Sequence, residues 1–233
     1  MEPLDLYAKI EPLIGFDAPY ERLYERYIKE LKSLHVNTIL DIGCGNGKLL
    51  HKLCDEGFEA QGIERSAHMV ERARQLGVHA SMQELESFEA ESFDALIAVA
   101  DVMNYMNPEE LIVFFQEVAR VLKKGGFFLG DINTLYGFEA IADGVMVKEE
   151  GEYFLSVDAS FEKPILKTTF TLFTCKEEHY TKEQGVIFQY FHPIAFFKKL
   201  KNLKFYTSYP IMLFALDEAD KTLIVLQKKL KIL

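Results

Sequence analysis

The sequence lacks the features that mark membrane, secreted and metal-binding proteins. It has no apolar run of the roughly 18 residues that cross a membrane, and no basic start followed by an apolar leader core. We therefore expect a cytoplasmic protein with no membrane partner. Cysteine is scarce, and Cys44, Cys54 and Cys175 have neither CxxC nor Cys/His metal spacing. They are expected to be reduced, mostly buried thiols.

Positive charge is also in short supply. The chain has 26 Lys and Arg residues against 36 Asp and Glu residues, a formal net charge of −10. Nucleic-acid binding depends largely on lysine and arginine contacts to phosphates, so we expect no nucleic-acid partner. The lysine-rich stretch KKLKNLK at 198–204 is interpreted as the solvated face of a late helix.

No internal repeat or low-complexity linker is present, and strand-like and helix-like segments alternate along the chain. An amphipathic helix over 19–34 precedes this alternation. Strands are predicted at 38–42, 58–64, 78–81, 93–100 and 127–132, and helices at 45–57, 66–77 and 108–126. Such alternation favours a parallel sheet covered on both faces, because right-handed crossovers place a helix over each connection. We predict an α/β fold with a Rossmann-like, doubly wound, mostly parallel seven-stranded sheet.

The pattern changes near residue 145. Segments 145–157, 165–175 and 185–191 are rich in aromatic and β-branched residues and predict an antiparallel β insertion. A helix is expected over 193–203, followed by strands over 204–214 and 221–229. The predicted organisation is an N-terminal helical segment, 1–35, packing on a main domain, 36–144 with 192–233, that carries the β lobe 145–191.

The aromatic residues of this lobe are more than a solvent face should carry, so we expect many to be buried against each other or around a ligand. They are Phe154, Phe161, Phe170, Phe173, Phe188, Tyr190 and Phe191. Because the lobe follows the fifth strand, we expect it to act as a lid and acceptor pocket.

The stretch ILDIGCGNGKLL at 39–50 places Gly43, Gly45 and Gly47 at alternate positions directly after the first strand. Such a turn lets the backbone approach a ligand at the C-terminal edge of an open α/β sheet. A dinucleotide is one candidate. Its diphosphate would lie close to Asp41, however, and like charges repel by about 1 kcal/mol at 4 Å even in water. S-adenosylmethionine, whose ammonium and sulfonium are positive, is favoured instead. Glu64, 21 residues beyond Gly43, can accept both ribose hydroxyls, which serves either cofactor.

These residues resemble the class I S-adenosylmethionine-dependent methyltransferases over roughly residues 36–133. LDIGCGNGKLL is similar to the family's first motif, GIERSAHMVERAR to its second-strand segment, and FDALIAVADVMNYM with ARVLKKGGFFLGDINT to strands four and five. More narrowly, FDAPYERL, DVMNY and DINTLYGFE resemble a bacterial branch of small-molecule methyltransferases that carries a β insertion after strand five.

The resemblance implies roles for individual residues. Gly43, Gly45 and Gly47 would cradle the methionine part, Asp41 would help to hold its amino group, and Glu64 would hold the ribose. Ser81 stands where the family often has an acid, Met82 can cover the adenine face, and the adenine N6 contact falls to Gln83 or a backbone group. The predicted cofactor site also includes Cys44, Arg65 and Ala100.

Methyl transfer depends mainly on alignment, and a base is needed only for a nucleophile that is still protonated. The predicted catalytic residues are Asp101, Tyr105 and His192, and the predicted substrate residues are Tyr20, Asn104, Tyr105, Asn133 and Tyr136. No [DN]-P-P-[YFW] motif follows strand four, which disfavours methylation of exocyclic amines of adenine or glutamine type. Asp101, Asp131 and Asn133 could instead hold magnesium, but the leading prediction includes no metal.

The sequence therefore favours an enzyme that methylates a small-molecule O, N or C nucleophile. Two alternatives stay open at this point. One is a catalytically inactive module that binds S-adenosylmethionine, and the other is a protein or tRNA methyltransferase. The acceptor and the oligomeric state are left open.

Overall fold

The structure is a computed structural model that describes residues 3–15, 17–177 and 179–230. The predicted segments 1–35, 145–191 and 192–233 each include a few positions that lie outside the described residues. Within it, no helix is both long enough and apolar enough to cross a membrane.

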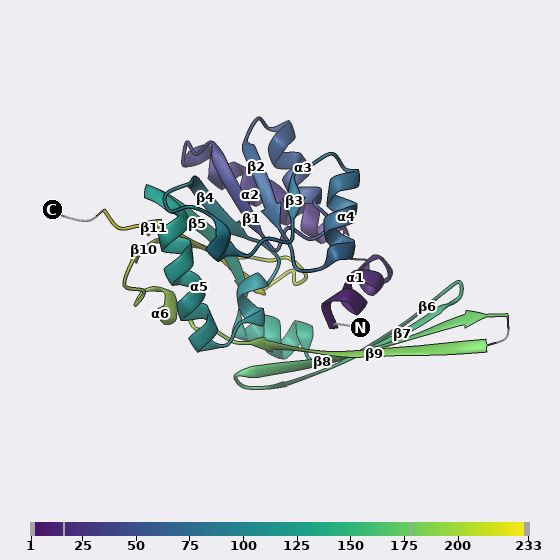
Figure 1. The fold of residues 1–233 in the computed structure, drawn as a ribbon. Helices are drawn as coiled ribbons and strands as arrows, with labels where there is room; N and C mark the ends of the chain where they lie inside the picture. Colours follow the sequence, from purple (N-terminus) through teal and green to yellow (C-terminus); the bar gives the residue numbers. More distant parts are fainter. Residues whose placement is uncertain (1–2, 16, 178, 231–233) are drawn as a thin grey trace.

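A seven-stranded sheet forms the centre of the molecule, in the order β10-β11-β5-β4-β1-β2-β3 (Figure 1). Its strands are β1 (Thr38–Ile42), β2 (Glu59–Ile63), β3 (Ala80–Ser81), β4 (Phe93–Ala98), β5 (Leu122–Asn133), β10 (Leu203–Ile211) and β11 (Lys221–Lys228). The pairings among β1 to β5 are parallel, whereas β11 runs antiparallel to both β5 and β10. The predicted mostly parallel, seven-stranded sheet is confirmed.

Helices cover both faces of this sheet, as the doubly wound prediction requires. The helices are α2 (Asp17–Ser33), α3 (Lys48–Asp55), α4 (Ala67–Gln75), α5 (Pro108–Val121) and α6 (Ile194–Phe197). Apolar side chains of α2 and α3 pack on one face, and those of α5 and α6 pack on the other. Short helical turns η1 (Leu85–Ser87), η2 (Val102–Tyr105) and η3 (Gly137–Ala142) lie between these elements.

Local sequence signals explain where these helices begin. The Ser66 side chain accepts a hydrogen bond from the backbone N–H of Met69 at 3.4 Å and so caps α4. At the start of α5, Asn107 and Glu110 form a reciprocal capping box, with Pro108 at the first helical position. Because β2 and β4 both run parallel to β1, the loops that follow them lie at the same edge of the sheet.

The insertion is a four-stranded antiparallel sheet rather than the three predicted segments. Its strands are β6 (Gly144–Glu150), β7 (Tyr153–Glu162), β8 (Ile165–Lys176) and β9 (His179–Tyr190), in that order. The predicted segment 145–157 divides at Gly151, whose φ of +59° suits a tight turn that glycine adopts readily. Figure 1 shows this sheet extending below the main sheet as a long, separate layer.

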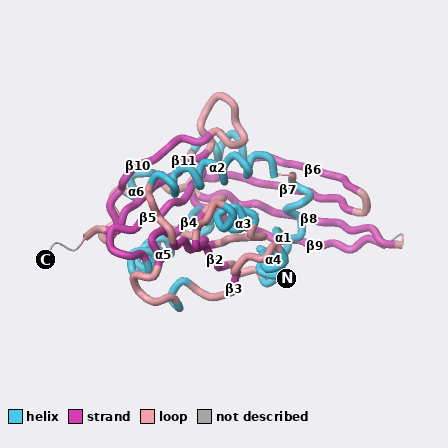
Figure 2. The backbone as a smooth tube through the Cα atoms, turned by 90° about the horizontal axis from the view of Figure 1, so that it is seen from above, coloured by secondary structure: helices cyan, strands magenta, loops and turns pink. Residues whose placement is uncertain are grey.

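Helix α1 (Pro3–Ile14) packs on the inserted sheet. Leu6 and Ile10 are buried against Leu155, Phe170 and Ile187 of that sheet. Apolar residues of α2 pack on the main sheet, whereas those on the inner face of α1 pack on the inserted sheet, and the predicted division into domains stays a prediction. Figure 1 shows α1 between α4 and the inserted sheet, and the view from above shows β6 to β9 extending to one side of the main domain (Figure 2).

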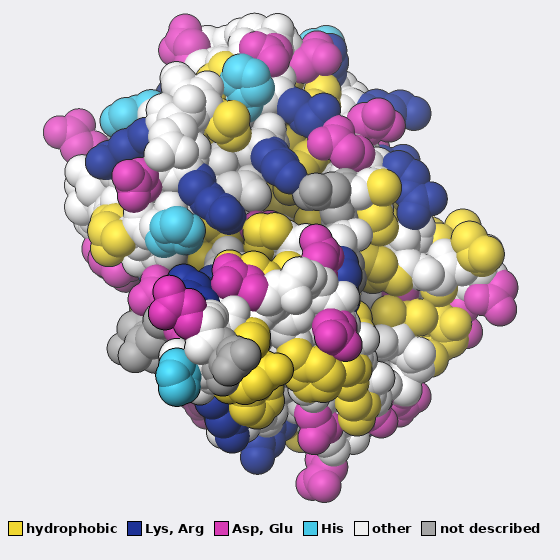
Figure 3. Space-filling model, turned by 90° about the vertical axis from the view of Figure 1, so that its right-hand side faces the viewer, with side chains coloured by type: hydrophobic (Ala, Val, Ile, Leu, Met, Phe, Trp, Pro, Cys, Tyr) yellow, Lys and Arg dark blue, Asp and Glu magenta, His cyan; other side chains and the backbone are white. Residues whose placement is uncertain are grey.

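Three further predictions need correction. The predicted helix 193–203 extends only from Ile194 to Phe197, so the lysine-rich stretch 198–204 is not a helical face. The Cys54 thiol is exposed, although Cys44 is buried as expected. Two of the lobe's aromatic residues, Phe154 and Phe188, are exposed on the sheet face opposite α1, since neighbouring residues of a strand point to opposite faces. Figure 3, which views the molecule from the right-hand side of Figure 1, shows apolar side chains over its lower half.

Candidate active site

A cavity of about 690 Å³ lies at the C-terminal edge of the main sheet. Its walls come from α1 and α2, the turn after β1, the end of β2, the loops after β3 and β4, and α5. This volume is typical of a pocket for a small ligand. The edge is also where open α/β sheets bind ligands, because the strand ends and helix starts meet there.

The glycine turn is tightly packed behind and open in front. Gly43, Gly45 and Gly47 all have positive φ values, between +54° and +81°. A side chain on Gly43 would meet Val102 at 2.8 Å, and one on Gly47 would meet Ala73 at 2.7 Å. At Gly45, by contrast, no atom lies within 4 Å of an added Cβ. Gly45 therefore presents bare backbone to the cavity.

Asp41 is a buried carboxylate at the end of β1, beside this turn. Its side chain lines the cavity, and its Oδ1 atom has no hydrogen-bond partner among the described residues. Burial, with a smaller contribution from the nearby Glu64 carboxylate, raises the pKa of Asp41 to about 7. An unpaired buried carboxylate is costly, so the site favours a positively charged or hydrogen-bonding ligand group at this point.

Glu64 is held in a fixed position at the end of β2. Its carboxylate accepts hydrogen bonds from the backbone N–H of Gly45 at 3.0 Å and of Ser66 at 2.9 Å. Each carboxylate oxygen can accept more than one hydrogen bond, so both oxygens keep capacity for ligand hydroxyls. Asp41, Glu64 and the open backbone of Gly45 together fit a ligand with an ammonium group and a ribose.

The other predicted cofactor residues divide between the cavity wall and positions behind it. Cys44, Arg65, Gln83 and Ala100 line the cavity together with Asp41, Gly43, Gly45 and Glu64. Gly47, Ser81 and Met82 do not, and Met82 is 56% exposed. The Ser81 hydroxyl donates to the Gln83 side chain at 3.2 Å. Gln83, rather than Ser81, is the polar side chain that this loop presents to the cavity.

Beside the cavity, the buried Lys221 contacts the three residues that the magnesium alternative would use as ligands, which are Asp101, Asp131 and Asn133. The Lys221 ammonium donates to Asp101, to Asp131 Oδ2 at 3.3 Å and to Asn133 Oδ1 at 2.9 Å. Three acceptors match the three N–H bonds of an ammonium, although burial lowers the pKa of Lys221 to about 7. The lysine occupies the position where the magnesium alternative would place its metal, which argues against that alternative.

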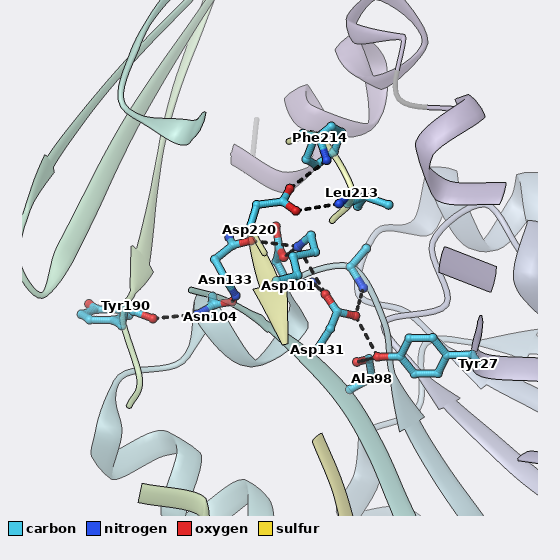
Figure 4. Close-up of polar contacts among 12 residues, drawn as sticks. Tyr27, Ala98, Asp101, Asn104, Asp131, Asn133, Tyr190, Leu213, Phe214 and Asp220 are labelled. Atoms are coloured by element: carbon cyan, nitrogen blue, oxygen red, sulfur yellow. Dashed lines mark hydrogen bonds and ion pairs between the residues drawn. The ribbon is translucent and has the colours of Figure 1, made fainter. Parts of the chain in front are cut away.

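Asp131 ties this lysine to the loop after β4. It accepts hydrogen bonds from the Tyr27 hydroxyl at 2.8 Å, the Ala100 N–H at 2.9 Å and the Asp101 N–H at 3.3 Å (Figure 4). Ala100 and Asp101 have φ values of +61° and +70°, which are unfavourable for residues with a side chain. Burial raises the pKa of Asp131 to about 6, although the hydrogen bonds from Tyr27 and Ala100 act to lower it. Asp131 and Lys221 therefore hold a strained loop that keeps Asp101 at the cavity wall.

The structure separates several predicted catalytic and substrate residues from the cavity. Asn104 is fully buried, where its amide donates to the Tyr190 carbonyl and accepts from the Asn133 N–H (Figure 4). Asn133 faces Lys221 rather than the cavity. His192 is buried, and its Nε2 donates to the Met106 carbonyl at 2.9 Å.

The predictions that Asn104, Asn133 and His192 contact the substrate or catalyse transfer therefore do not fit the geometry, because their polar atoms satisfy the fold. Tyr136, predicted to bind substrate, lies near the acidic loop 217–220 and outside the cavity wall. Tyr20, Asp101 and Tyr105 do line the cavity.

Several residues at or beside the cavity were missed from the sequence, among them Tyr7, Glu11 and Lys221. Tyr7 and Glu11 belong to α1, and both line the cavity. Leu6, Ile10, Leu13 and Ile14 recur at helical spacing, and this signal could have identified the helix. Lys221 could have been noticed as a charged residue at the start of the apolar run TLIVL.

Comparisons with known proteins agree with this geometry. Residues 39–126 match a family model described as a methyltransferase domain. A Bacillus subtilis (strain 168) relative, "Putative methyltransferase YqeM", is 30% identical over 138 residues, or 52% of this chain. The chain spans 56% of that relative's length. A Xenopus tropicalis protein named as a tRNA (carboxymethyluridine(34)-5-O)-methyltransferase is 36% identical over 92 residues, which are 39% of this chain and 14% of that protein.

Solved structures share nearly the whole fold. An S-adenosylmethionine-dependent methyltransferase from Clostridium acetobutylicum ATCC 824 matches with a TM-score of 0.78 at 19% identity, over 96% of this chain and 98% of that one. The S-adenosylmethionine-bound amino pentose methyltransferase CalS10 from Micromonospora echinaspora matches with a TM-score of 0.66 at 15% identity, over 89% of this chain and 91% of that one.

The fold of the chain is therefore the one found in S-adenosylmethionine-dependent methyltransferases of known structure. Within this fold, residues 39–126 are similar to the methyltransferase domain model, which covers less than half of the chain.

The first prediction concerns Gly45. Gly45→Val places a branched side chain in the space that the open backbone leaves for a ligand. We therefore expect at least a tenfold loss of affinity for S-adenosylhomocysteine, the demethylated form of S-adenosylmethionine. Calorimetry measures this affinity. Gly57→Val is the matched control, since Gly57 also has a positive φ and open space but lies outside the cavity wall. Both variants should lose similar stability through backbone strain. Equal ligand affinity in the two variants would show that the cradle lies elsewhere.

The second prediction concerns Lys221. Lys221→Met leaves the Asp131 and Asp101 carboxylates without their cation, so the free energy of unfolding should fall by about 3–5 kcal/mol. Urea denaturation measures this change, with the exposed Lys124→Met as the control, expected to stay within about 0.5 kcal/mol of the parent. A loss at Lys221 no larger than at Lys124 would contradict the buried ion pair.

Proposed function

We propose that this protein is an enzyme that binds S-adenosylmethionine and transfers its methyl group to a small-molecule nucleophile. The observation that carries the proposal is the buried Asp41 carboxylate with an unpartnered oxygen, beside a glycine turn whose backbone is open to the cavity. The ammonium group of S-adenosylmethionine would supply the positive counter-charge that this carboxylate does not have among the described residues. The diphosphate of a dinucleotide would instead place negative charge beside this negative carboxylate, and the two would repel.

Each residue of the proposed cofactor site has a distinct task. Asp41 would hold the ammonium group, Gly45 would allow close backbone approach, and the fixed carboxylate of Glu64 would accept the ribose hydroxyls. The backbone bonds to Glu64 orient it before binding, so little further ordering is required. When bound, the cofactor supplies an electrophilic methyl group.

The remaining cavity wall would bind the acceptor. Asp101, Tyr20 and Tyr105, which were predicted from the sequence, and Tyr7 from α1 line this wall. Their task would be to orient the nucleophile and to exclude water, since alignment provides much of the acceleration of a displacement. The Lys221 ammonium maintains the position of Asp101 from outside the cavity.

The roles of α1 and of the inserted lobe follow from their contacts. We propose that α1 is the cover over the cavity and that the insertion is the platform that supports α1. Asp5 accepts a hydrogen bond from Ser66 at 3.0 Å, Glu11 accepts one from Asn46 at 3.3 Å, and Lys9 pairs with Glu183 of β9. This modifies the expectation that the lobe itself forms the lid.

A small-molecule acceptor fits the charge of the cavity better than tRNA. Five carboxylates, from the loop after β3 and from α5, line the cavity; they are Glu84, Glu86, Glu109, Glu110 and Glu117. They would repel a phosphate backbone. A binding module without turnover remains the second reading, and it differs from the enzyme by lacking any transfer of a labelled methyl group to an acceptor.

The third prediction tests the proposed cofactor by calorimetry. S-adenosylhomocysteine should bind and NAD should bind more weakly. Below pH 7, free Asp41 is mostly protonated, and a ligand ammonium favours its ionised form, so binding should release a proton. Affinity should therefore fall as the pH is lowered below 7, by up to about tenfold per pH unit. Titrations in buffers of different ionisation enthalpy count the released protons.

Asp41→Asn is the control for this titration, because it should bind more weakly at pH 8 and lose the dependence on pH. Tighter binding of NAD would overturn the proposed cofactor. An affinity for S-adenosylhomocysteine that is constant from pH 5.5 to 8 in the parent would remove Asp41 from the ligand site.

A further inference from the structure

We infer that the acceptor is an amine, whose positively charged nitrogen is held among the side chains of Tyr7, Tyr20, Tyr105 and Asp101. This inference rests on the proposed function and names the acceptor class that the sequence left open. It is carried by the arrangement of aromatic rings and carboxylates on one part of the cavity wall.

Three tyrosines from separate elements converge on this part of the cavity. Tyr7 comes from α1, Tyr20 from α2 and Tyr105 from η2, and all three line the wall. Tyr7 packs edge-on against Phe170 at 5.8 Å between ring centroids, and Tyr20 packs edge-on against Phe214 at 6.3 Å. Neither phenylalanine lines the cavity, so both tyrosine rings are supported from behind. Aromatic rings grouped in this way bind cations through their negative faces.

The hydroxyl groups of these tyrosines are in electrostatic contact. Burial raises the pKa of Tyr7 to about 12, and it raises the pKa values of Tyr20 and Tyr105 further above the ordinary range. All three phenols are therefore neutral at physiological pH. They can act as hydrogen-bond partners and as ring faces, whereas none can serve as a ready base for an alcohol or carbon acid.

The formal charges around the tyrosines favour a cation. Asp101 lines the cavity, its backbone N–H donates to the buried Asp131, and Asp131 acts electrostatically on Tyr20. The opposing cation, Lys221, is 1% exposed and lies behind Asp101, outside the cavity wall. Among the wall residues of the described chain, Arg65 is the cationic side chain, and it follows Glu64 on the ribose side. Asp101 and Asp131 share the one ammonium of Lys221, so the acceptor region combines aromatic rings with a net negative formal charge.

An amine makes use of this environment during methyl transfer. An ammonium group first loses one proton to water, and the nitrogen lone pair then forms the new N–C bond. The S–C bond of the cofactor breaks with its electron pair left on sulfur, so the sulfonium becomes a neutral thioether. The positive charge passes to the methylated nitrogen. Tyrosine faces and Asp101 would stabilise that charge as it develops, and such stabilisation accelerates the reaction.

The test compares two probes of the same shape in protein saturated with S-adenosylhomocysteine, whose sulfur is neutral. Choline carries a quaternary ammonium, and 3,3-dimethylbutan-1-ol is its uncharged carbon counterpart. We expect choline to bind at least tenfold more tightly, measured by NMR titration of the loaded protein. Equal affinities, or no binding of either probe by loaded protein, would overturn the amine inference.

Variants locate the preference on the tyrosines. Tyr105→Phe keeps the aromatic ring and should retain the preference for choline, whereas Tyr105→Leu should lose most of it. Tyr180→Leu, at an exposed position on the inserted sheet, is the control and should behave as the parent. Retention of the full preference by Tyr105→Leu would contradict the assignment of Tyr105.

The affinity for S-adenosylhomocysteine is measured first on every variant. It distinguishes a failure of the proposed function from a failure of the amine inference. A parent protein that does not bind this ligand removes the proposed function and the inference with it. A parent that binds it without preferring the charged probe removes the inference alone.

Discussion

Two carboxylates buried at the C-terminal edge of one sheet set the constraint from which this site follows. Asp131 on β5 has a cation of the chain's own, the Lys221 ammonium, and hydrogen bonds from Tyr27 and the loop after β4. Asp41 on β1 keeps an oxygen atom without a partner among the described residues. Since an unpaired buried charge is costly, the first carboxylate stabilises the fold and the second is left for a ligand.

This difference divides the cavity wall into two regions. On the side of Asp41, the open backbone of Gly45 and the fixed Glu64 fit the amino acid and ribose portions of the cofactor. On the other side, Asp101 is held at the wall by Lys221, and tyrosines from α1, α2 and η2 surround the space beside it. The inserted sheet supports α1, which reaches the glycine turn through Glu11 and the start of α4 through Asp5. In the proposed assignment, α1 covers both the cofactor region and the acceptor region.

The sequence predicted the central sheet and the cofactor turn well, because both depend on local patterns. Alternating periodicity identified the five parallel strands, and the spacing of Gly43, Gly45 and Gly47 identified the turn. Contacts between distant segments could not be read in this way. His192 and Asn104 looked like chemical groups, yet their polar atoms bind backbone of remote loops. The partner of Asp131, Lys221, comes from a strand 90 residues later. The sequence predicted a helical segment over 1–35 without the bounds of α1, and the packing of α1 on an inserted sheet has no local signal.

The most direct test of the central claim is the titration of the Asp41 carboxyl group, followed by carbon-13 NMR in the free and S-adenosylhomocysteine-bound protein. Burial places the pKa of Asp41 at about 7 in the free protein. A bound ammonium should lower it, so that the resonance stays that of a carboxylate down to at least pH 5.5. Asp41→Asn identifies the signal by removing it. A free-state titration near the ordinary value of an aspartate, unchanged by the ligand, would contradict the claim that this carboxylate is reserved for a cation.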